Sequence, residues 1–450
     1  MMEHESGFFV RFRQTRFAAV LDRIRRPRVL VPLYVVCMLV FGSIGILTTP
    51  IGSISDTWAH IYRIDAFLNG KLFAEPVGSL SLIYQVPGTS YGGPVDWDLV
   101  HLSTTADDLT SVVMVDTITT STAEQAYVPF NGAAIYSPLS YLPYLLGLSL
   151  AKALGASALA QYYVMLFFGL VFFCAISAIS LLILPRFRIL AALFYVFPLS
   201  IMLISSITAD GMTLAYIAFF SCLLYRCYVF RPTRPMLALL MFLGFLVAFS
   251  KLAYAPLLFA PLALFFIHRR LKGKAIVISG VFASTVLLLL WTSTTGSFAT
   301  NPNVVSTAEI AARTSAILSN PLPLIQRVLY SIFTLQGYSA TFDIRHVLVA
   351  LFFYLCVLLA FILVTVQLVK KRFDKKQAIF WYACIVLVVL SVFLIFTALY
   401  LQYDIRETPG IIGVQPRRYF WPMALLMLFS IGESIYVLNP IKKPLDEAHD

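Results

Sequence analysis

Residues 159–183 read LAQYYVMLFFGLVFFCAISAISLLI, a stretch of 25 residues without a charged side chain. A helix that crosses the hydrocarbon core of a bilayer needs about 20 apolar residues, and this stretch is long enough. The whole chain has the same character, because 60% of it is hydrophobic, 12% is charged and the mean hydropathy is +0.85. A soluble protein of 450 residues cannot bury so much apolar surface. The sequence therefore predicts an all-α polytopic membrane protein.

Nine further apolar runs lie on either side of this stretch, so about ten transmembrane helices are expected. The basic N-terminus precedes an apolar run without an A-x-A-like cleavage site, which indicates a retained first span rather than a signal peptide. Two of the ten runs, 236–250 and 253–267, are shorter than a usual span and predict a broken or bent pair whose junction lies below the membrane surface. The ten expected spans are 29–49, 159–183, 188–206, 211–229, 236–250, 253–267, 275–294, 346–369, 378–400 and 418–438.

Basic residues predict the orientation of the spans. The segments on one side carry 23 of the 33 Lys and Arg residues, which favours that side as cytoplasmic. We therefore expect a cytoplasmic basic N-terminus (1–28), a membrane domain (29–438) and a cytoplasmic tail (439–450) in a membrane of the inner-membrane type. The net charge of +11 is explained by this bias, so no nucleic-acid partner is expected.

Two outer segments, 50–158 and 295–345, are long enough to have structure of their own. The part at 85–130 is rich in Thr, Ser, Asp and Gly with β-branched residues, which predicts a small irregular or strand-bearing region. All six cysteines lie inside apolar runs, so neither a disulfide framework nor a cysteine metal site is expected.

The first candidate motif is DTWAHIYR, which follows the first span. As a helix it places Asp56, His60 and Arg63 on one stripe, so it is predicted to be an amphipathic helix at the membrane surface. Such a stripe suits an acceptor hydroxyl and a phosphate. The alternative is a helix-capping Asp56 with an interfacial Arg63. A metal-ligand role for His60 is less favoured, since no partner residue has a suitable spacing.

The second and third motifs are YSPLSYLPY and SSITADG. Two prolines argue against a regular span in the former, so Tyr136 and Tyr141 are expected at or in the outer leaflet, as ligand contacts or plain aromatic anchors. Asp210 lies at the start of a span in the latter. The Asp210 carboxylate is expected either to stabilise the positive end of the helix dipole or to contact a substrate.

The fourth and fifth motifs supply cations. FSKLAY places Lys251, with Tyr254 after it, between the two short spans, where a bare charge is unfavourable and an anionic partner is expected; the alternative is snorkelling to the surface. GVQPRRYFWP places Gln415, Arg417 and Arg418 on the outer side, against the positive-inside trend. Arginine forks match phosphate oxygens, although interfacial anchoring is the alternative.

The chain has no phosphate-binding loop of the G-x-x-x-x-G-K-[ST] type and no dinucleotide fingerprint. An activated donor outside the membrane must therefore be carried by another molecule, and a lipid phosphate is the physical candidate. Its headgroup needs cations and the acceptor hydroxyl needs a base, for which Asp56 is the residue we expect.

The order of these five motifs, from about residue 30 to 438, resembles the bacterial predicted-membrane-protein family called domain-of-unknown-function 2142. That family resembles the GT-C class of membrane glycosyltransferases. The resemblance implies a GT-C-like fold, a polyprenyl-phosphate-linked sugar donor, a cell-surface glycan acceptor and an acidic base, which matches Asp56. Two features depart from the family pattern: Thr57 stands where a second acid is common, and Arg417 is an additional residue before Arg418.

The expected function is thus a membrane glycosyltransferase acting on the outer face, with Asp56 as base and no metal or cofactor assigned; a divalent metal is possible but has no support in the sequence. The alternatives are a transporter or flippase of a lipid-linked saccharide, for which Glu433 is the chief inner charge, and a non-catalytic assembly or lipid-binding protein. Expected donor-phosphate ligands are Lys251, Arg418, Arg417 and Arg63. Expected substrate contacts are His60, Tyr136, Tyr141, Asp210, Tyr254 and Gln415.

Overall fold

The computed structural model describes residues 26–54, 56–77, 90–106, 125–299, 305–334, 338, 344–402, 410, 411 and 413–438. The expected basic N-terminus (1–28) and tail (439–450) lie almost wholly outside these residues.

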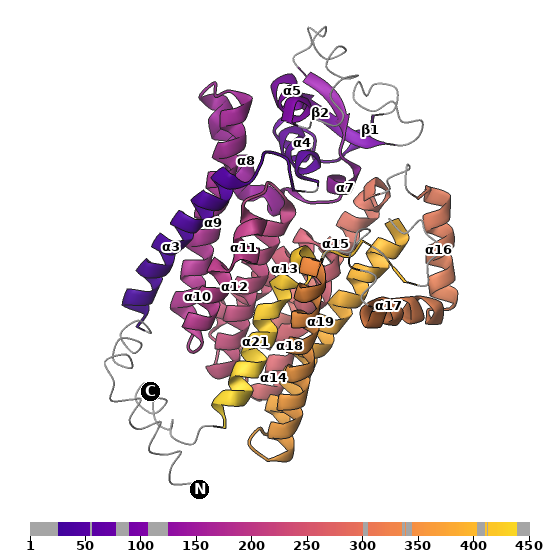
Figure 1. Cartoon of the computed structure of the whole chain (residues 1–450). Helices are drawn as coiled ribbons and strands as arrows, with labels where there is room; N and C mark the ends of the chain where they lie inside the picture. The colour runs from indigo at the N-terminus through magenta and orange to yellow at the C-terminus, as the bar shows by residue number, and fades with distance from the viewer. Residues whose placement is uncertain are drawn as a thin grey trace.

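Six described helices are long and apolar enough to cross a membrane. They run side by side as a bundle (Figure 1). The central one is α12, in which every residue except Arg226 and Val229 is buried. By contrast, α3 and α15 each bury only five of their 22 residues. The six are α3 (Pro27–Thr48), α9 (Ala158–Ile183), α12 (Ala209–Val229), α15 (Lys274–Thr295), α18 (Ile344–Val369) and α19 (Lys375–Gln402). A multi-helix membrane protein is confirmed.

The segment predicted as one span at 188–206 is divided into α10 (Arg188–Val196) and α11 (Pro198–Ile204). Pro198 has no N–H, so the carbonyl of Phe194 loses its usual helical donor. The hydroxyl of Ser200 donates to that carbonyl instead, at 2.7 Å, and the indole N–H of Trp421 donates to Ser200 at 2.8 Å. The break is therefore stabilised by a residue of another helix.

The two short spans are also interrupted. α13 (Arg234–Ser250) ends at Lys251, and the chain continues as a 3-10 helix, η3 (Leu252–Ala263), and one turn of α-helix, α14 (Leu264–Ile267). Two prolines inside η3 remove backbone donors and prevent a regular α-helix. The last apolar segment begins as α20 (Pro416–Tyr419) and continues as α21 (Trp421–Tyr436).

A small region from the segment expected on the outer side, which we call the outer region, covers one end of the bundle (Figure 1). It contains an antiparallel sheet in the order β1-β2-β3, which confirms the predicted strand-bearing region. Gly92 is required in β2, because a Cβ there would lie 1.9 Å from the carbonyl oxygen of Val128. The strands are β1 (Glu75–Pro76), β2 (Tyr91–Asp96) and β3 (Gln125–Pro129). The helices are α4 (Thr57–Leu68), α5 (Trp97–Ala106), α7 (Asn131–Ala134), η2 (Pro138–Tyr141) and α8 (Leu142–Ala153).

A buried ion pair holds this outer region together. Asp65 of α4 is inaccessible to solvent and accepts a hydrogen bond from the ammonium of Lys152 at the end of α8. Lys152 also contacts Asp96 of β2 at 2.7 Å, and the backbone N–H of Asp96 donates to Asp65 at 2.8 Å. Two helices and a strand are thereby fixed relative to one another.

The second outer segment forms η4 (Gly296–Ala299), α16 (Thr307–Ser319) and α17 (Leu322–Thr334). α17 lies across the direction of the spans (Figure 1). It buries Leu324 and Val328, leaves Phe333 80% exposed, and accepts the N–H of Ile411 on the hydroxyl of Ser331 at 2.7 Å. An apolar exposed face of this kind suits a helix in the membrane interface.

Candidate functional site

Asp210 lies in the first turn of α12, at the end of the bundle that the outer region covers. The side chain of Thr208 caps the helix by accepting the N–H of Asp210 at 3.3 Å. Asp210 is 2% exposed, and its Oδ1 accepts a hydrogen bond from the ammonium of Lys251, which is 6% exposed. Lys251 reaches this carboxylate because α13 ends beside the start of α12. Two charges that are unfavourable alone in an apolar bundle are therefore paired.

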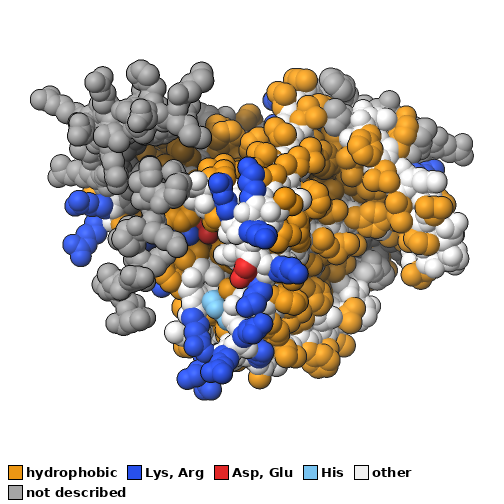
Figure 2. Space-filling view, turned by 90° about the horizontal axis from the view of Figure 1, so that it is seen from below, with side chains coloured by type: hydrophobic (Ala, Val, Ile, Leu, Met, Phe, Trp, Pro, Cys, Tyr) orange, Lys and Arg blue, Asp and Glu red, His pale blue; other side chains and the backbone are white. Residues whose placement is uncertain are grey.

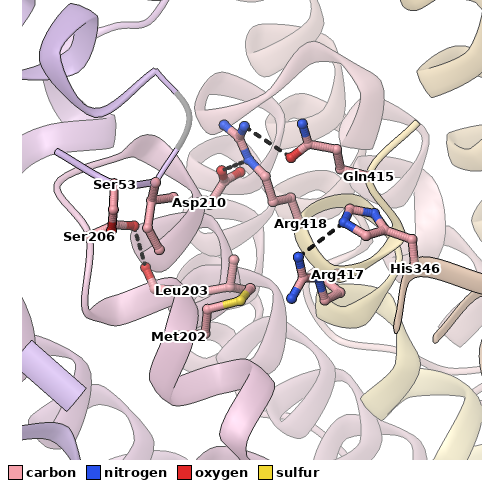
Figure 3. Close-up of a pocket in the computed structure, with 10 residues that line it drawn as sticks. Ser53, Met202, Leu203, Ser206, Asp210, His346, Gln415, Arg417 and Arg418 are labelled. Atoms are coloured by element: carbon pink, nitrogen blue, oxygen red, sulfur yellow. Dashed lines mark hydrogen bonds and ion pairs between the residues drawn. The ribbon is translucent and has the colours of Figure 1, made fainter. Parts of the chain in front are cut away.

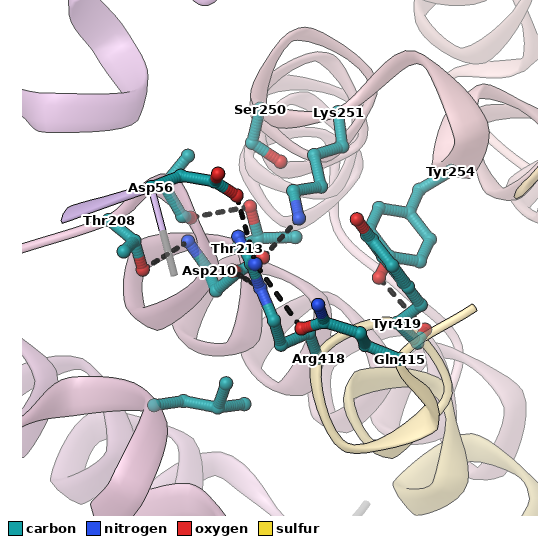
Figure 4. A network of polar contacts seen from close by, with 12 residues as sticks. Asp56, Thr208, Asp210, Thr213, Ser250, Lys251, Tyr254, Gln415, Arg418 and Tyr419 are labelled. Carbon is teal, nitrogen blue, oxygen red and sulfur yellow. Dashed lines mark hydrogen bonds and ion pairs between the residues drawn. The ribbon is translucent and has the colours of Figure 1, made fainter. Parts of the chain in front are cut away.

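Arg418 connects Asp210 to the first motif (Figure 4). Its Nε donates to Oδ2 of Asp210 at 2.6 Å, and its Nη1 donates to Oδ2 of Asp56 at 3.1 Å. The same Nη1 lies 3.3 Å from Oε1 of Gln415. Asp56, Asp210, Lys251 and Arg418, which we call the four-residue cluster, thus come from four distant segments of the chain. The structure brings together one predicted base, two predicted cations and one predicted substrate contact.

Asp56 differs from the other three members because it faces solvent. Its side chain is 59% exposed, and its backbone has a φ of 68°, in the left-handed region. A non-glycine residue in that region costs about 1 kcal/mol, and such residues are frequent at functional sites. Its carboxylate makes no capping hydrogen bond with α4. The alternative of a helix-capping Asp56 therefore does not describe this side chain, which contacts Arg418 instead.

Tyr419 and Tyr254 lie beside the cluster (Figure 4). The ammonium of Lys251 lies 4.5 Å from the centre of the Tyr419 ring, a cation–π distance. The hydroxyl of Tyr254 donates to the carbonyl of Tyr419 at 2.9 Å, so the buried Tyr254 holds α20 against η3. Tyr254 thus acts on the position of the neighbouring Arg418.

His60, Tyr136 and Tyr141 form an adjoining polar and aromatic group. Nδ1 of His60 shares a hydrogen bond with the hydroxyl of Tyr141, and the ring centre of Tyr136 lies 5.3 Å from that of His60. His60 is 2% exposed, and burial lowers its pKa to about 4. The imidazole is therefore neutral at neutral pH. The polar stripe of α4 faces into the protein rather than along the membrane surface.

Arg63 lies apart from the four-residue cluster. Its guanidinium is fully buried, donates from Nη2 to the carbonyl of Leu72 at 2.8 Å, and lies 4.0 Å from the centre of the Phe67 ring. Burial lowers its pKa to about 10. The contacts described for this predicted phosphate ligand are all within the outer region.

A cavity of about 250 Å³ opens beside the cluster (Figure 3). Asp210, Gln415, Arg417 and Arg418 line it, and Nη2 of Arg417 lies 3.0 Å from Nε2 of His346. The volume is below the ~300–1,000 Å³ of sites for drug-sized ligands, so it suits a headgroup rather than a polymer. The remaining lining residues are Ser53, Ile54, Met202, Leu203 and Ser206.

Sequence reasoning missed His346, Ser53 and Ser206 as cavity residues. His346 lies at the outer start of an expected span, where an ionisable residue is a signal that the sequence analysis did not use. The two serines have no comparable signal, because serine is frequent in loops and in membrane helices. Among the described residues, no group of three or more His, Cys, Asp or Glu side chains is placed to hold a metal ion.

Comparisons with known proteins place the chain in a family without transferring an activity. No curated protein and no solved structure matches it significantly. A family model described as predicted membrane protein (DUF2142) matches residues 39–427, which include all four residues of the cluster. Because this match spans most of the 450 residues, the chain belongs to the DUF2142 family of predicted membrane proteins.

Proposed function

We propose that this protein is a membrane glycosyltransferase that moves a sugar from a polyprenyl-phosphate donor to a cell-surface glycan on the outer face of the membrane. The supporting observation is that Arg418 joins the exposed carboxylate of Asp56 to the buried Asp210–Lys251 pair. Two of these four residues, Asp210 and Arg418, line the cavity. An exposed acid beside fixed cations suits a reaction in which a proton is removed and a phosphate departs.

In the proposed step, one bond to the anomeric carbon of the sugar forms and another breaks. The acceptor hydroxyl oxygen attacks the anomeric carbon, and the bond from that carbon to the donor phosphate oxygen breaks. Polyprenyl phosphate leaves with the bonding electron pair, while Asp56 takes the hydroxyl proton. The products are the glycosylated acceptor and the lipid phosphate.

The charges of the cluster couple these two events. Two carboxylates and two cations sum to zero before the reaction, which suits a mostly buried group. When Asp56 becomes protonated, Lys251 and Arg418 are opposed by Asp210 alone, and the cluster gains one positive charge. That charge appears when the phosphate departs and would stabilise it. Arg417 and His346, on the cavity wall, are proposed to contact the donor headgroup.

The proposal includes a membrane arrangement. All ten predicted segments would cross or enter a bacterial cytoplasmic membrane in a GT-C-like arrangement, with both termini cytoplasmic. The four-residue cluster would then lie at the outer surface, where a lipid-linked donor and a surface acceptor meet.

A flippase remains the second candidate, and Glu433 is the residue on which it depends. Glu433 accepts hydrogen bonds from Nη1 of Arg186 at 3.1 Å and from the hydroxyl of Tyr225 at 2.5 Å. These contacts join α21, α12 and the α9–α10 turn. They favour a structural role for Glu433 over a site on a transport path.

The test is Asp56→Asn in purified protein with a polyprenyl-phosphate-linked sugar and in cells by mass analysis of surface glycans. We expect transfer to fall by about 10²–10⁴-fold, the usual contribution of a general base, with unchanged membrane insertion. Asp98→Asn is the matched control, because Asp98 is an exposed acid of α5 outside the cluster.

Two results would contradict the proposal. Surface glycans and transfer that are unchanged in Asp56→Asn would remove Asp56 as the base. Accumulation of the lipid-linked sugar on the inner leaflet, without loss of transfer by the purified protein, would favour the flippase.

A further inference from the structure

A second cavity lies at the opposite end of the bundle, where α18 ends and α19 begins. Its volume is about 690 Å³, larger than that of the cavity beside the four-residue cluster. Leu368 of α18 and Ile379 and Tyr382 of α19 line its apolar wall, and Lys371 and Lys375 also line it. Since α18 and α19 are both long enough to span a membrane, the turn between them lies at a membrane surface.

The backbone of this turn gives Lys371 an unusual position. Lys371 has a φ of 55°, in the left-handed region that usually selects glycine after a helix. The turn is fixed by N–H groups of Arg372 and Phe373, which donate to the carbonyl of Gln367 at 2.9 and 3.1 Å, and by the buried Phe373 ring. Glycine would meet the backbone requirement without steric cost. A lysine here instead places a cationic residue among those that line the cavity.

Asp374, the acidic residue among those that line the cavity, forms hydrogen bonds with the start of α19. Oδ1 of Asp374 accepts the N–H of Gln377 at 2.7 Å, and Oε1 of Gln377 accepts the N–H of Asp374 at 3.0 Å. This reciprocal pair caps the start of α19. The segment 370–376 carries five Lys or Arg residues against this one acid, so its net charge is +4.

We propose that this cavity binds an anionic phospholipid of the adjacent leaflet. The headgroup phosphate would contact Lys371 and Lys375, and an acyl chain would lie along Leu368, Ile379 and Tyr382. Figure 2 shows this end of the molecule, with Lys and Arg side chains gathered beside a broad hydrophobic surface. Basic pockets between transmembrane helices recognise lipid headgroups in this way. The apolar wall favours a lipid over a soluble anion, because only a lipid has an acyl chain that can contact it. This site is independent of the proposed glycosyl transfer.

Lys371→Gly is a suitable test variant, because it removes the ammonium while glycine readily adopts the left-handed backbone conformation of this position. The experiment titrates phosphatidylglycerol, phosphatidylcholine or inorganic phosphate into the purified full chain in detergent and follows bound lipid by native mass spectrometry. Lys371→Gly and Lys375→Gln each remove a lining cation. Lys370→Gln and Arg372→Gln each remove a cation of the same turn that does not line the cavity.

We expect wild-type protein to prefer phosphatidylglycerol over phosphatidylcholine, and each lining variant to bind it about fivefold more weakly. The two control variants should bind it nearly as wild type does. An equal loss in all four variants would indicate diffuse charge attraction and overturn the proposal. Competition by inorganic phosphate alone would identify a soluble-anion site, which would also overturn it.

Discussion

Asp210 organises the candidate site because it can accept from two cations at once. Lys251 uses Oδ1 and Arg418 uses Oδ2, so each buried cation has a buried acceptor and Arg418 keeps Nη1 for Asp56. Removing the shared acid would take the carboxylate partner from the buried Lys251 and leave Arg418 with the exposed Asp56 alone, which is less favourable than removing Asp56. Asp56 is therefore the member of the cluster that can change protonation without loss of the fold.

The buried neutral His60 predicts a pH dependence of stability. Its folded pKa of about 4 lies below the ordinary value of 6.5, so below pH 6.5 the unfolded chain binds a proton that the folded chain does not. The contribution of the neutral His60 to the free energy of unfolding is fully present above pH 6.5 and is lost as the pH falls towards 4. The expected loss is about 3 kcal/mol in the free energy of unfolding. His60→Asn should remove this component.

The measurement is thermal unfolding of both proteins in detergent from pH 4 to 7. The difference between wild type and His60→Asn isolates His60 from the other titrating groups. A difference that stays constant over this range would contradict a neutral buried imidazole.

At the residue scale, the sequence predicted that the reactive residues share one side, and the structure brings four of them together. The sequence did not predict which of them touch. Arg417 and Arg418 stood out because they oppose the positive-inside trend, and Arg418 is in the cluster. Helical periodicity placed Arg63 on one stripe with Asp56 and His60, yet Arg63 contacts Leu72. Periodicity gives a direction around a helix, whereas the partner met in that direction depends on long-range packing.

At the element scale, α12 is joined at both ends to the segment formed by α20 and α21, in one register. Asp210 pairs with Arg418 at the outer end, and Tyr225 pairs with Glu433 at the other, and both pairs are separated by 208 residues in the sequence. The two contacts are 15 residues apart along each chain segment, about 22 Å in an α-helix. The inner contact therefore helps to set the position of Arg418.

Tyr225→Phe tests this connection, because it removes one hydroxyl and keeps the ring. Loss of a hydrogen bond to a charged group corresponds to about 1.5–3 kcal/mol. We expect faster amide hydrogen exchange in the peptide around Arg418 as well as around Glu433. Tyr382→Phe is the control, because its hydroxyl pairs with Thr365 away from these two helices. Faster exchange confined to the inner ends would show that the two contacts are independent.

Sequence patterns predicted the existence of the helices better than their continuity. Pro198 and the prolines of η3 were visible in the sequence, and they are where regular helix fails. The stabilising contact from Trp421 to Ser200 was not predictable, because it joins residues more than 200 positions apart. The sheet was expected from composition, but its strand order depends on the same kind of distant pairing.

For the whole molecule, the orientation of the bundle decides whether the four-residue cluster can meet a surface acceptor. Arginine and lysine segments predict that the end with Lys371 is cytoplasmic and the end with α5 is external. The described cysteines allow a direct test, since five are buried and Cys37 is half-buried in α3. Thr105→Cys and Arg372→Cys place exposed thiols at opposite ends. A membrane-impermeant maleimide added to intact cells should label Thr105→Cys, and should label Arg372→Cys only after the membrane is opened. The reverse pattern would place Asp56 in the cytoplasm, where a surface glycan cannot reach it.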